Sequence, residues 1–417
     1  MGILYISYDG MLEPLGQSQV LAYQEKLSST NKITVLSFEK RQDWQDKASL
    51  GRMRARMKAA GITWVPLTYH KRPTAPATAF DILAGTCVAL WIVLRHRKKV
   101  VHVRSYVPAT MGWIVTRLTG AKFLFDIRGF WADERVEGGI WPANSRLYRY
   151  AKYLERRFFL AADQVVTLTH ASKREIEKFN YLRGRVPPVE VIPTCADLEM
   201  FKPLGLDCPA VFTLGYLGSV GSWYLFDEVV ACFKILLEHE PLARLLIVNR
   251  GEHQSILESL QRGGVERARV SLESAEHRDV PKFIGRMSAA AAIIKPVYSK
   301  IASAPTKLAE YLGCGVPCLG NDRVGDMAEI LEDNRVGVAL TDFSDGDRRA
   351  AVTRLLELVR EPQTRQRCVE TARSLFSLDG GVALYRDIYN RLSSRLNPGS
   401  TDPGIPAAVS GTVKIAP

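Results

Sequence analysis

The feature that most constrains the fold of this sequence is a repeated alternation of short β-branched runs with longer helical segments. A first series of runs occupies residues 3–7, 33–38, 62–67, 100–103, 123–127 and 165–168. A second series occupies residues 212–217, 245–248, 270–272, 291–294, 316–319 and 337–340. Strands that alternate with helices along a chain form parallel sheets with helices on their faces. The alternation therefore predicts an α/β protein with two parallel sheets.

The passage between the two series places the domain boundary. Residues 184–209 are rich in residues that interrupt regular structure, namely Pro187, Pro188, Pro193, Pro203 and Gly205. A helix or strand cannot run through such a passage without a break. We therefore expect one Rossmann-like domain over residues 1–187 and a second over residues 188–379.

The end of the chain is expected to contain a helix and a tail. Over residues 380–395, apolar side chains fall at helical spacing on one face, namely Val382, Leu384, Tyr385, Ile388, Tyr389 and Leu392. We expect this face to pack back on the first domain, because an apolar helix face must be buried. Residues 396–417 are rich in Pro, Gly, Ser and Thr with little apolar periodicity, which predicts a disordered tail.

Size, charge and cysteine content limit the class of protein. A chain of 417 residues exceeds what one hydrophobic core usually supports. The formal net charge of +12 favours anionic partners, which include nucleic acid, acidic lipid headgroups and phosphorylated small molecules. The seven cysteines form no CxxC pair, which fits a reducing cytosol, and the first residues read as a buried strand rather than a signal peptide.

One long apolar stretch, residues 79–94, raises the question of a membrane span. It contains Asp81 and stops short of the roughly 20 residues that a spanning helix needs. We therefore expect a buried helix and no transmembrane segment.

The most informative segment for chemistry is 303–320, which reads as loop, helix, glycine turn and buried strand. Thr306, Lys307 and Glu310 are spaced to share one face near the helix start. Free backbone N–H groups and the helix dipole favour an anion such as a diphosphate there, and Lys307 adds a positive charge. Glu310, one turn later, could accept hydrogen bonds from ribose hydroxyls. The alternative is that Lys307 and Glu310 form an ordinary surface pair.

At this point the sequence resembles a known family. Pro-Thr-Lys-x-x-Glu-Tyr followed by Gly-x-Pro, at residues 305–317, is similar to the donor-nucleotide helix of the retaining family 4 glycosyltransferases. The resemblance implies the GT-B fold, in which two Rossmann-like domains face each other across a cleft. Glu310 matches the second glutamate of a pair in that family, and Ala302 stands where the first would fall. The contact that the first glutamate makes to the donor sugar is therefore missing or supplied differently.

A second match is the glycine-rich segment 216–222, which resembles the family's turn facing the donor. Gly218 and Ser219 would let the backbone approach phosphate closely. Relatives often carry an Arg and a Lys after this turn, where this chain has Ser219, Ser222, Trp223 and Tyr224. Lys307 could compensate, or Arg250 after the next strand, although Arg250 could equally be a solvated loop residue. A weaker match at 191–197 resembles the interdomain sequence of the family.

The first strand-to-helix loop of the N-terminal domain is a candidate acceptor or diphosphate loop. Gly16 would give close backbone access to the cleft, and Gln17 and Ser18 offer neutral hydrogen-bond donors. Helix capping by Ser18 is a compatible alternative.

Arg128 follows the strand at 123–127, at a position where many relatives carry a His that contacts the donor sugar. We expect Arg128 to take that electrostatic role, with a buried ion pair to Asp126 or Asp133 as the alternative. His102 ends another strand and is interpreted as structural.

The resemblance implies transfer of a sugar from a nucleotide-diphosphate donor to a hydroxyl of a glycan or lipid-linked acceptor, with retention of configuration. It implies no metal and no cofactor beyond the nucleotide sugar as co-substrate, and polysaccharide or glycoconjugate biosynthesis in the cytoplasm. Lys307, Glu310 and Arg128 would be the catalytic residues. The basic runs 52–58 and 95–99 could sit on an anionic membrane surface and bring a lipid-linked acceptor to the cleft, or be solvated helix faces.

Other function classes fit less well. A nicotinamide oxidoreductase is disfavoured because no Gly-x-Gly-x-x-Gly opens the first helix of either domain. A nucleic-acid reader is disfavoured because the basic residues lack interleaved aromatic residues. Two alternatives stay open, a sugar-nucleotide epimerase of the same fold and a non-catalytic nucleotide-sugar-binding protein.

Overall fold

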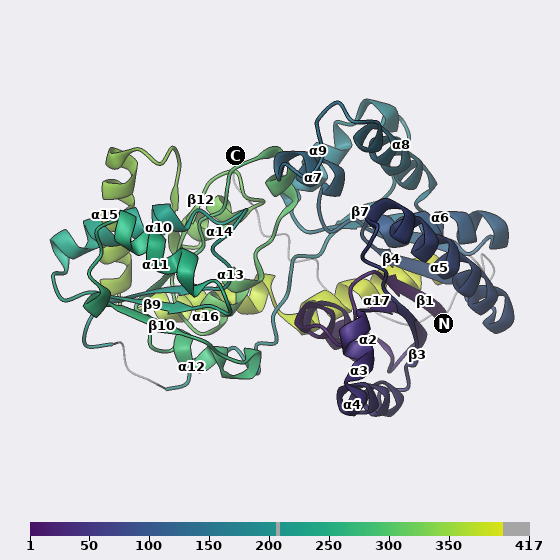
Figure 1. The fold of residues 1–417 in the computed structure, drawn as a ribbon, viewed down its shortest axis with the longest axis horizontal. Helices are drawn as coiled ribbons and strands as arrows, with labels where there is room; N and C mark the ends of the chain where they lie inside the picture. The colour runs from purple at the N-terminus through teal and green to yellow at the C-terminus, as the bar shows by residue number, and fades with distance from the viewer. Residues whose placement is uncertain (206–208, 395–417) are drawn as a thin grey trace.

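The computed structural model describes residues 1–205 and 209–394. Two α/β domains, each built on a parallel sheet, lie end to end along the long axis of the molecule (Figure 1). The predicted fold class is thereby confirmed. The tail predicted at 396–417 lies outside the described residues.

The N-terminal sheet has seven strands in the order β3-β2-β1-β4-β5-β6-β7, and every neighbouring pair is parallel. Its strands are β1 (Gly2–Ser7), β2 (Lys32–Glu39), β3 (Thr63–Thr68), β4 (Val100–Arg104), β5 (Lys122–Asp126), β6 (Gln164–Thr167) and β7 (Val189–Val191). The strand order reverses between β1 and β4, and this is the switch point at which open α/β sheets bind ligands.

Successive residues of β1 point to opposite faces of this sheet and feed two separate cores. Leu4 and Ile6 pack in one core with α5, α6 and α8, whereas Ile3 and Tyr5 pack in the other with α2, α4 and α17. The helical elements of the domain are α1 (Pro14–Gly16), η1 (Gln17–Leu21), α2 (Ala22–Leu27), α3 (Arg41–Gln45), α4 (Lys47–Ala59), α5 (Thr74–His96), α6 (Tyr106–Thr119), α7 (Trp131–Glu137), α8 (Arg146–Ala161), α9 (His170–Glu177) and η2 (Asn180–Leu182).

The C-terminal sheet has six parallel strands in the order β10-β9-β8-β11-β12-β13. They are β8 (Thr213–Leu217), β9 (Arg244–Val248), β10 (Val270–Glu273), β11 (Ala289–Ala291), β12 (Cys318–Asn321) and β13 (Gly337–Leu340). The helical elements are α10 (Phe226–His239), α11 (His253–Arg262), η3 (Arg267–Arg269), η4 (His277–Asp279), α12 (Val280–Ile284), η5 (Tyr298–Ala302), α13 (Thr306–Gly313), α14 (Met327–Asp333), α15 (Asp345–Arg360) and α16 (Thr364–Leu375).

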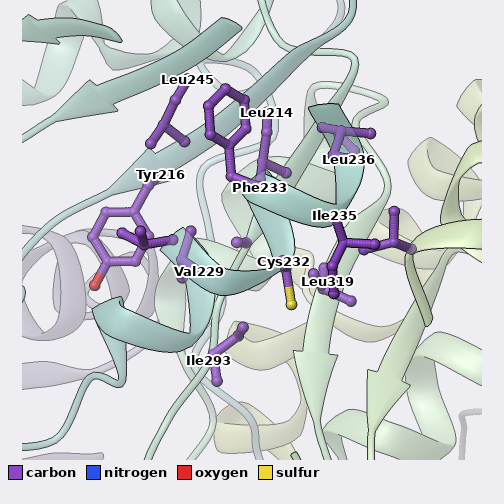
Figure 2. Close-up of a cluster of buried hydrophobic side chains, with 14 of the residues drawn as sticks. Leu214, Tyr216, Val229, Cys232, Phe233, Ile235, Leu236, Leu245, Ile293 and Leu319 are labelled. Carbon is purple, nitrogen blue, oxygen red and sulfur yellow. The ribbon is translucent and has the colours of Figure 1, made fainter. Parts of the chain in front are cut away.

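One core of the C-terminal domain lies between its sheet and the helices α10, α11 and α15. Leu214 of β8 and Phe233 of α10 are packed in its interior (Figure 2). Tyr216 lies at the edge of this cluster, with its hydroxyl pointing away from Leu214 and Phe233 (Figure 2). The ring is therefore anchored in the core while the hydroxyl reaches the loop that follows β8.

Most predicted strands occur within one or two residues of their predicted bounds. β12 begins at Cys318 rather than at residue 316 because Pro317 has no N–H to donate to a neighbouring strand. β7 was missed, because its three residues lie between prolines in the passage read as a boundary; as the last strand of its sheet it is an edge strand, where neighbouring prolines are tolerated.

Helix α5 corrects the expectation of a buried helix at 79–94. It runs for 23 residues, is long and apolar enough to cross a membrane, and has a third of its most apolar window buried. One face packs on the sheet, whereas the opposite face exposes several large apolar side chains. Asp81, which argued for burial, is buried and accepts hydrogen bonds from the hydroxyl of Tyr8 and the backbone N–H of His70.

The last helix among the described residues, α17 (Leu378–Ser394), packs against α2 of the N-terminal domain. Five of the six residues proposed for its apolar face are buried, whereas Leu384 is 37% exposed. Tyr385 donates a hydrogen bond to Asp126 at 3.0 Å, and the Tyr389 hydroxyl lies 2.8 Å from Nδ1 of the buried His102. The helix thus ties the last described residues to strands β4 and β5.

The two domains meet through η5, which follows β11 in the C-terminal sheet. Lys300 forms an ion pair with Glu134 of α7 at 3.0 Å, and the Tyr298 ring stacks on Phe130 at 5.3 Å. The contacts also include backbone groups, since the Thr169 hydroxyl donates to the carbonyl of Ile301 at 2.7 Å. Because η5, α7 and α9 all follow strands at their carboxyl ends, the ligand-binding edges of the two sheets meet here.

Candidate nucleotide-sugar site

Lys307 lies at the start of α13 and is buried. Its Nζ donates to the carbonyl of Leu217 at 2.6 Å and lies over the rings of Tyr224 and Tyr216, 3.9 and 4.8 Å from their centroids. A buried ammonium between aromatic faces is stabilised by their quadrupoles. Lys307 is thus not an ordinary surface residue, and its cation faces the turn after β8. Thr306, the first residue of the helix, is partly exposed beside it.

Burial also changes the titration of Lys307. Desolvation lowers its pKa to about 8, although the nearby Glu310 acts in the opposite direction. A positive charge held in a desolvated place gains more from an arriving anion than a charge in water does. Strongly shifted ionisable groups of this kind are characteristic of functional sites.

The glycine turn after β8 lies directly beside this cation. Gly218 has φ of +91°, and a Cβ atom at this position would lie 3.5 Å from Nζ of Lys307. A side chain from β8 fixes the conformation of the turn, because the Tyr216 hydroxyl donates to the Ser219 carbonyl at 2.5 Å. The structure therefore brings together Gly218, Ser219 and Lys307, as expected from the sequence.

Glu252 also belongs to this site, although no motif in the sequence predicts it. Its carboxylate accepts the N–H of Val220 at 3.2 Å and a hydrogen bond from the Asn249 side chain at 2.9 Å. The N–H groups of Gly218 and Val220 are therefore satisfied by protein, since Gly218 donates to the carbonyl of Val248 at 2.9 Å. Within residues 1–205 and 209–394, the N–H groups of Ser219 and Ser222 have no protein acceptor. These groups can donate hydrogen bonds to an incoming phosphate oxygen.

Glu310 lies one turn further along α13. Its Oε1 is 3.3 Å from Nε2 of His277, whose ring packs edge-on against Phe201 at 5.4 Å. His277 was not singled out from the sequence, since a lone His before a short helical turn carries no pattern. The pair Glu310 and His277 offers both an acceptor and a donor to a diol such as a ribose.

Ala302, where a glutamate was expected from the resemblance, is fully buried in the N-terminal core that contains Phe130. A carboxylate at this position would be desolvated, which is unfavourable by several kcal/mol unless a cation pairs with it. The interdomain contact thus explains the small residue. Lys300, two residues earlier, lies 3.8 Å from the Trp223 ring centroid and was also missed from the sequence.

Arg128 follows β5 with φ of +58°, and its side chain is largely buried. Of the two ion pairs considered from the sequence, the structure has the one to Asp126, at 3.9 Å; Asp133 pairs with Lys152 instead, at 2.9 Å. Burial alone would raise the pKa of Asp126, but the positive charge of Arg128 and its other neighbours lower it. Asp126 therefore keeps a negative charge that holds Arg128 at the edge of the sheet.

The first loop of the N-terminal domain differs from expectation. A Cβ atom on Gly16 would lie 1.9 Å from the carbonyl oxygen of Gly10, so this carbonyl fills the space that we expected to be open to a ligand. Ser18 does not cap a helix; its hydroxyl donates to the carbonyl of Pro14 at 2.9 Å, within the helix. Gln17 donates to the carbonyl of Leu12 at 3.2 Å. The three residues hold the loop together rather than present free donors.

Arg250 is not brought together with Lys307. Its side chain is 52% exposed, and it donates to the Ala275 carbonyl at 2.7 Å and pairs with Glu276 at 3.0 Å. A role in donor binding stays a prediction for this residue. Among the described residues, no three His, Cys, Asp or Glu side chains gather as metal ligands do.

The structure resembles solved glycosyltransferases over nearly the whole chain. A glycosyltransferase from Rickettsia africae has a TM-score of 0.68 and 14% identity, covering 94% of this chain and 98% of its own. Sucrose-phosphate synthase from Thermosynechococcus elongatus has a TM-score of 0.69 and 14% identity, with 94% and 99% covered. HepE from Anabaena, solved with UDP and glucose, has a TM-score of 0.63 and 16% identity, with 94% and 100% covered. At such identity the likeness shows the fold.

Family models assign the two domains. Residues 32–195 match the glycosyl transferase 4-like domain, and residues 211–375 match the glycosyl transferases group 1 domain. No curated protein sequence matches the chain. The two matched segments cover most of both domains and bring the site at α13 within the second. The chain belongs to the family 4 glycosyltransferases, which pair these two domains in the GT-B fold.

Proposed function

We propose that this protein transfers a sugar from a nucleotide-diphosphate donor to a hydroxyl of a glycan or lipid-linked acceptor, with retention of configuration. The observation that carries the proposal is the buried cation of Lys307 beside the glycine turn at Gly218, with Glu310 one turn further along the same helix. This spacing suits a diphosphate at the helix start and a ribose at Glu310.

In the proposed reaction, the glycosidic bond to the diphosphate breaks and negative charge grows on the leaving phosphate. Lys307 and the free N–H groups of the turn stabilise that charge, as preorganised donors do for other developing oxyanions. Arg128 acts from the opposite domain. The leaving phosphate oxygen accepts the proton of the acceptor hydroxyl on the same face of the sugar, so no protein nucleophile is required. We propose that neither a metal ion nor a further cofactor takes part.

The solved neighbours suggest which substrates to test first. HepE was solved with UDP-glucose, and the neighbour WaaB is a lipopolysaccharide outer core galactosyltransferase. A UDP-hexose donor and a lipid-linked saccharide acceptor are therefore the first choices. We propose a cytoplasmic location, with the acceptor presented by the inner face of the membrane, as in polysaccharide assembly.

The test is release of nucleotide from a panel of nucleotide sugars, with and without extracted lipid-linked acceptors, and with and without a chelator. Wild type is compared with Lys307→Ala and Glu310→Ala, and with Lys234→Ala as a matched control on the exposed surface of α10. We expect acceptor-dependent, chelator-insensitive release that either site substitution lowers by about 100-fold or more and the control leaves unchanged.

Other outcomes would redirect the assignment. Turnover of the donor without any acceptor would favour the epimerase alternative. Donor binding without turnover under every condition would favour the non-catalytic alternative. This alternative arises because Ala302 stands where the family resemblance places a glutamate that contacts the donor sugar. Anomeric configuration of the product, read by NMR, tests retention directly.

A further inference from the structure

The outer face of α5 carries a continuous apolar stripe. Phe80, Leu83, Trp91 and Leu94 are 57%, 64%, 60% and 61% exposed. They recur at spacings that place them on one side of the helix, opposite the buried residues that pack on the sheet. A surface helix of a soluble domain normally turns polar side chains outward, so this second apolar face requires a partner.

The stripe continues over the two neighbouring helices. α6 lies beside α5, because Gly85 leaves room for the side chain of Met111, and α8 packs on α6 where Phe158 meets Trp113 at 6.3 Å. These helices add further exposed apolar or aromatic residues, namely Leu118 on α6 and Leu147, Tyr150, Tyr153 and Leu160 on α8. We call the outward surfaces of α5, α6 and α8 the outer helical face.

The charge of the outer helical face has one sign. The three helices contain two carboxylates, Asp81 and Glu155, and both are buried. Asp81 is hydrogen-bonded to Tyr8, and Glu155 forms an ion pair with Lys152 at 2.6 Å. Five exposed arginines remain on the surface, namely Arg95, Arg117, Arg146, Arg149 and Arg156. Apolar, aromatic and cationic side chains therefore share one surface that exposes no carboxylate.

We propose that the outer helical face binds an anionic phospholipid bilayer, with the apolar stripe of α5 at the boundary between headgroups and acyl chains. Trp and Tyr side chains favour this boundary, and arginines pair with lipid phosphates. A helix lies in the plane of the interface when one face is apolar and its surroundings are basic. The other face of α5 stays packed on the sheet, so the protein lies on the membrane and does not span it.

A second copy of the chain suits this surface less well. A symmetric dimer would bring the same patches together, and the arginines of the two copies would then repel each other without carboxylates to balance them. The basic run at 52–58 does not join the outer helical face. It lies on α4, whose Met53 and Met57 pack in the core on the opposite side of the sheet, and its Arg56 pairs with Glu25 at 2.7 Å.

This inference goes beyond the proposed function and does not depend on it, because binding is measured without donor or acceptor. The full chain is floated with vesicles that contain phosphatidylglycerol and, separately, with pure phosphatidylcholine vesicles. We expect binding to the anionic vesicles that weakens strongly at about 1 M salt, where charges are screened beyond about 3 Å.

Two variants test the two components. Leu83→Glu with Trp91→Glu should lower the partition coefficient at least about tenfold, because two charged side chains replace two apolar side chains at the boundary between headgroups and acyl chains. Arg146→Glu with Arg149→Glu should lower binding and its salt dependence. Leu242→Glu, on an apolar residue of the C-terminal domain that is 72% exposed, is the matched control and should bind as wild type. Unchanged melting temperatures would show that all variants fold.

The proposal is overturned if wild type fails to bind anionic vesicles, or if Leu83→Glu with Trp91→Glu binds as wild type does. A concentration-dependent dimer in solution that the same pair of substitutions abolishes, with no vesicle binding, would assign the face to self-association instead. Quenching of Trp91 fluorescence by brominated lipids, lost in Trp91→Phe, measures insertion of the stripe independently of flotation.

Discussion

Each of the two domains has a first strand-to-helix loop that a glutamate holds in place, but the two loops have different roles. In the N-terminal domain the loop follows β1, and the carboxylate of Glu39 at the end of β2 accepts the N–H groups of Met11 and Leu12 at 2.9 and 3.2 Å. In the C-terminal domain the loop follows β8, and Glu252 after β9 accepts the N–H of Val220. A glutamate at the end of the neighbouring strand (Glu39) or in the loop after it (Glu252) thus holds each loop.

The difference lies in what each loop leaves open. Glu39 is fully buried, which raises its pKa, and the loop around it is closed by the contact of Gly16 with Gly10. The loop after β8 is only partly satisfied by Glu252, and Gly218 faces a buried cation. The same topological position therefore serves as internal structure in one domain and as a candidate anion site in the other.

Alanine substitutions of Gly16 and Gly218 should lower the unfolding free energy by different amounts and for different reasons. Gly16→Ala places a methyl group against a backbone oxygen that cannot move away, so we expect loss of roughly 3 kcal/mol or more of unfolding free energy. Gly218→Ala has space but must hold a residue with φ of +91°, which costs about 1–2 kcal/mol. Urea denaturation measures both.

Donor binding should separate the two glycines further. At a temperature where both variants are folded, Gly16→Ala should bind a nucleotide sugar as wild type does, and Gly218→Ala should bind it less tightly. The reverse pattern would mean that the first loop of the N-terminal domain contacts the donor after all.

Lys307→Met should lower nucleotide release by about 100-fold while leaving the protein as stable as wild type or more so. Burial lowers the pKa of Lys307 from 10.5 to about 8, so the charged side chain is destabilised in the fold by about 3 kcal/mol. Methionine removes this penalty, although it leaves the Leu217 carbonyl without its donor. A variant that is both inactive and much less stable would contradict a functional reason for the buried charge.

The same pKa predicts a pH dependence with a definite sign. Below pH 8, Lys307 is protonated in the folded and unfolded states, and its penalty is fully present. Between about pH 8 and 10.5 the unfolded state binds more protons, so the contribution of Lys307 to stability improves as the pH rises. The stability advantage of Lys307→Met should therefore shrink across this window. Donor affinity of the free enzyme should fall as the pH rises through about 8.

Periodicity in the sequence was sufficient to predict the two sheets, because buried strands and amphipathic helices repeat at distinct periods. The site at α13 could also be anticipated from the spacing of Thr306, Lys307 and Glu310. Glu252 and His277 could not, since each reaches the site from a separate loop through contacts that only the folded chain creates.

Two expectations failed for the same physical reason. Gly16 was expected to admit a ligand, and residues 79–94 were expected to form a buried helix. A glycine in the sequence indicates that another group can approach the backbone closely, and an apolar run indicates a helix with apolar faces. Neither pattern indicates which part of the folded chain, if any, occupies the neighbouring space. In the fold, a carbonyl occupies the space at Gly16, and no element described in the structure covers the outer side of α5.

Arg250→Ala should have the smallest effect, within about twofold on donor affinity, because an exposed ion pair contributes little and the residue makes no contact with Lys307. The hydrogen bond to Ala275 and the ion pair to Glu276 hold the guanidinium away from the turn. Glu276→Gln provides a second test, because it removes the negative charge that pairs with Arg250 and so frees the guanidinium to move. If Arg250 turns to the diphosphate when the donor binds, Glu276→Gln should raise donor affinity, and Arg250→Ala should cancel the gain. If Glu276→Gln has no effect on donor affinity, Arg250 does not bind the diphosphate. Of Arg250 and Lys307, only Lys307 would then take the place of the basic pair that the family resemblance leads us to expect after the glycine turn.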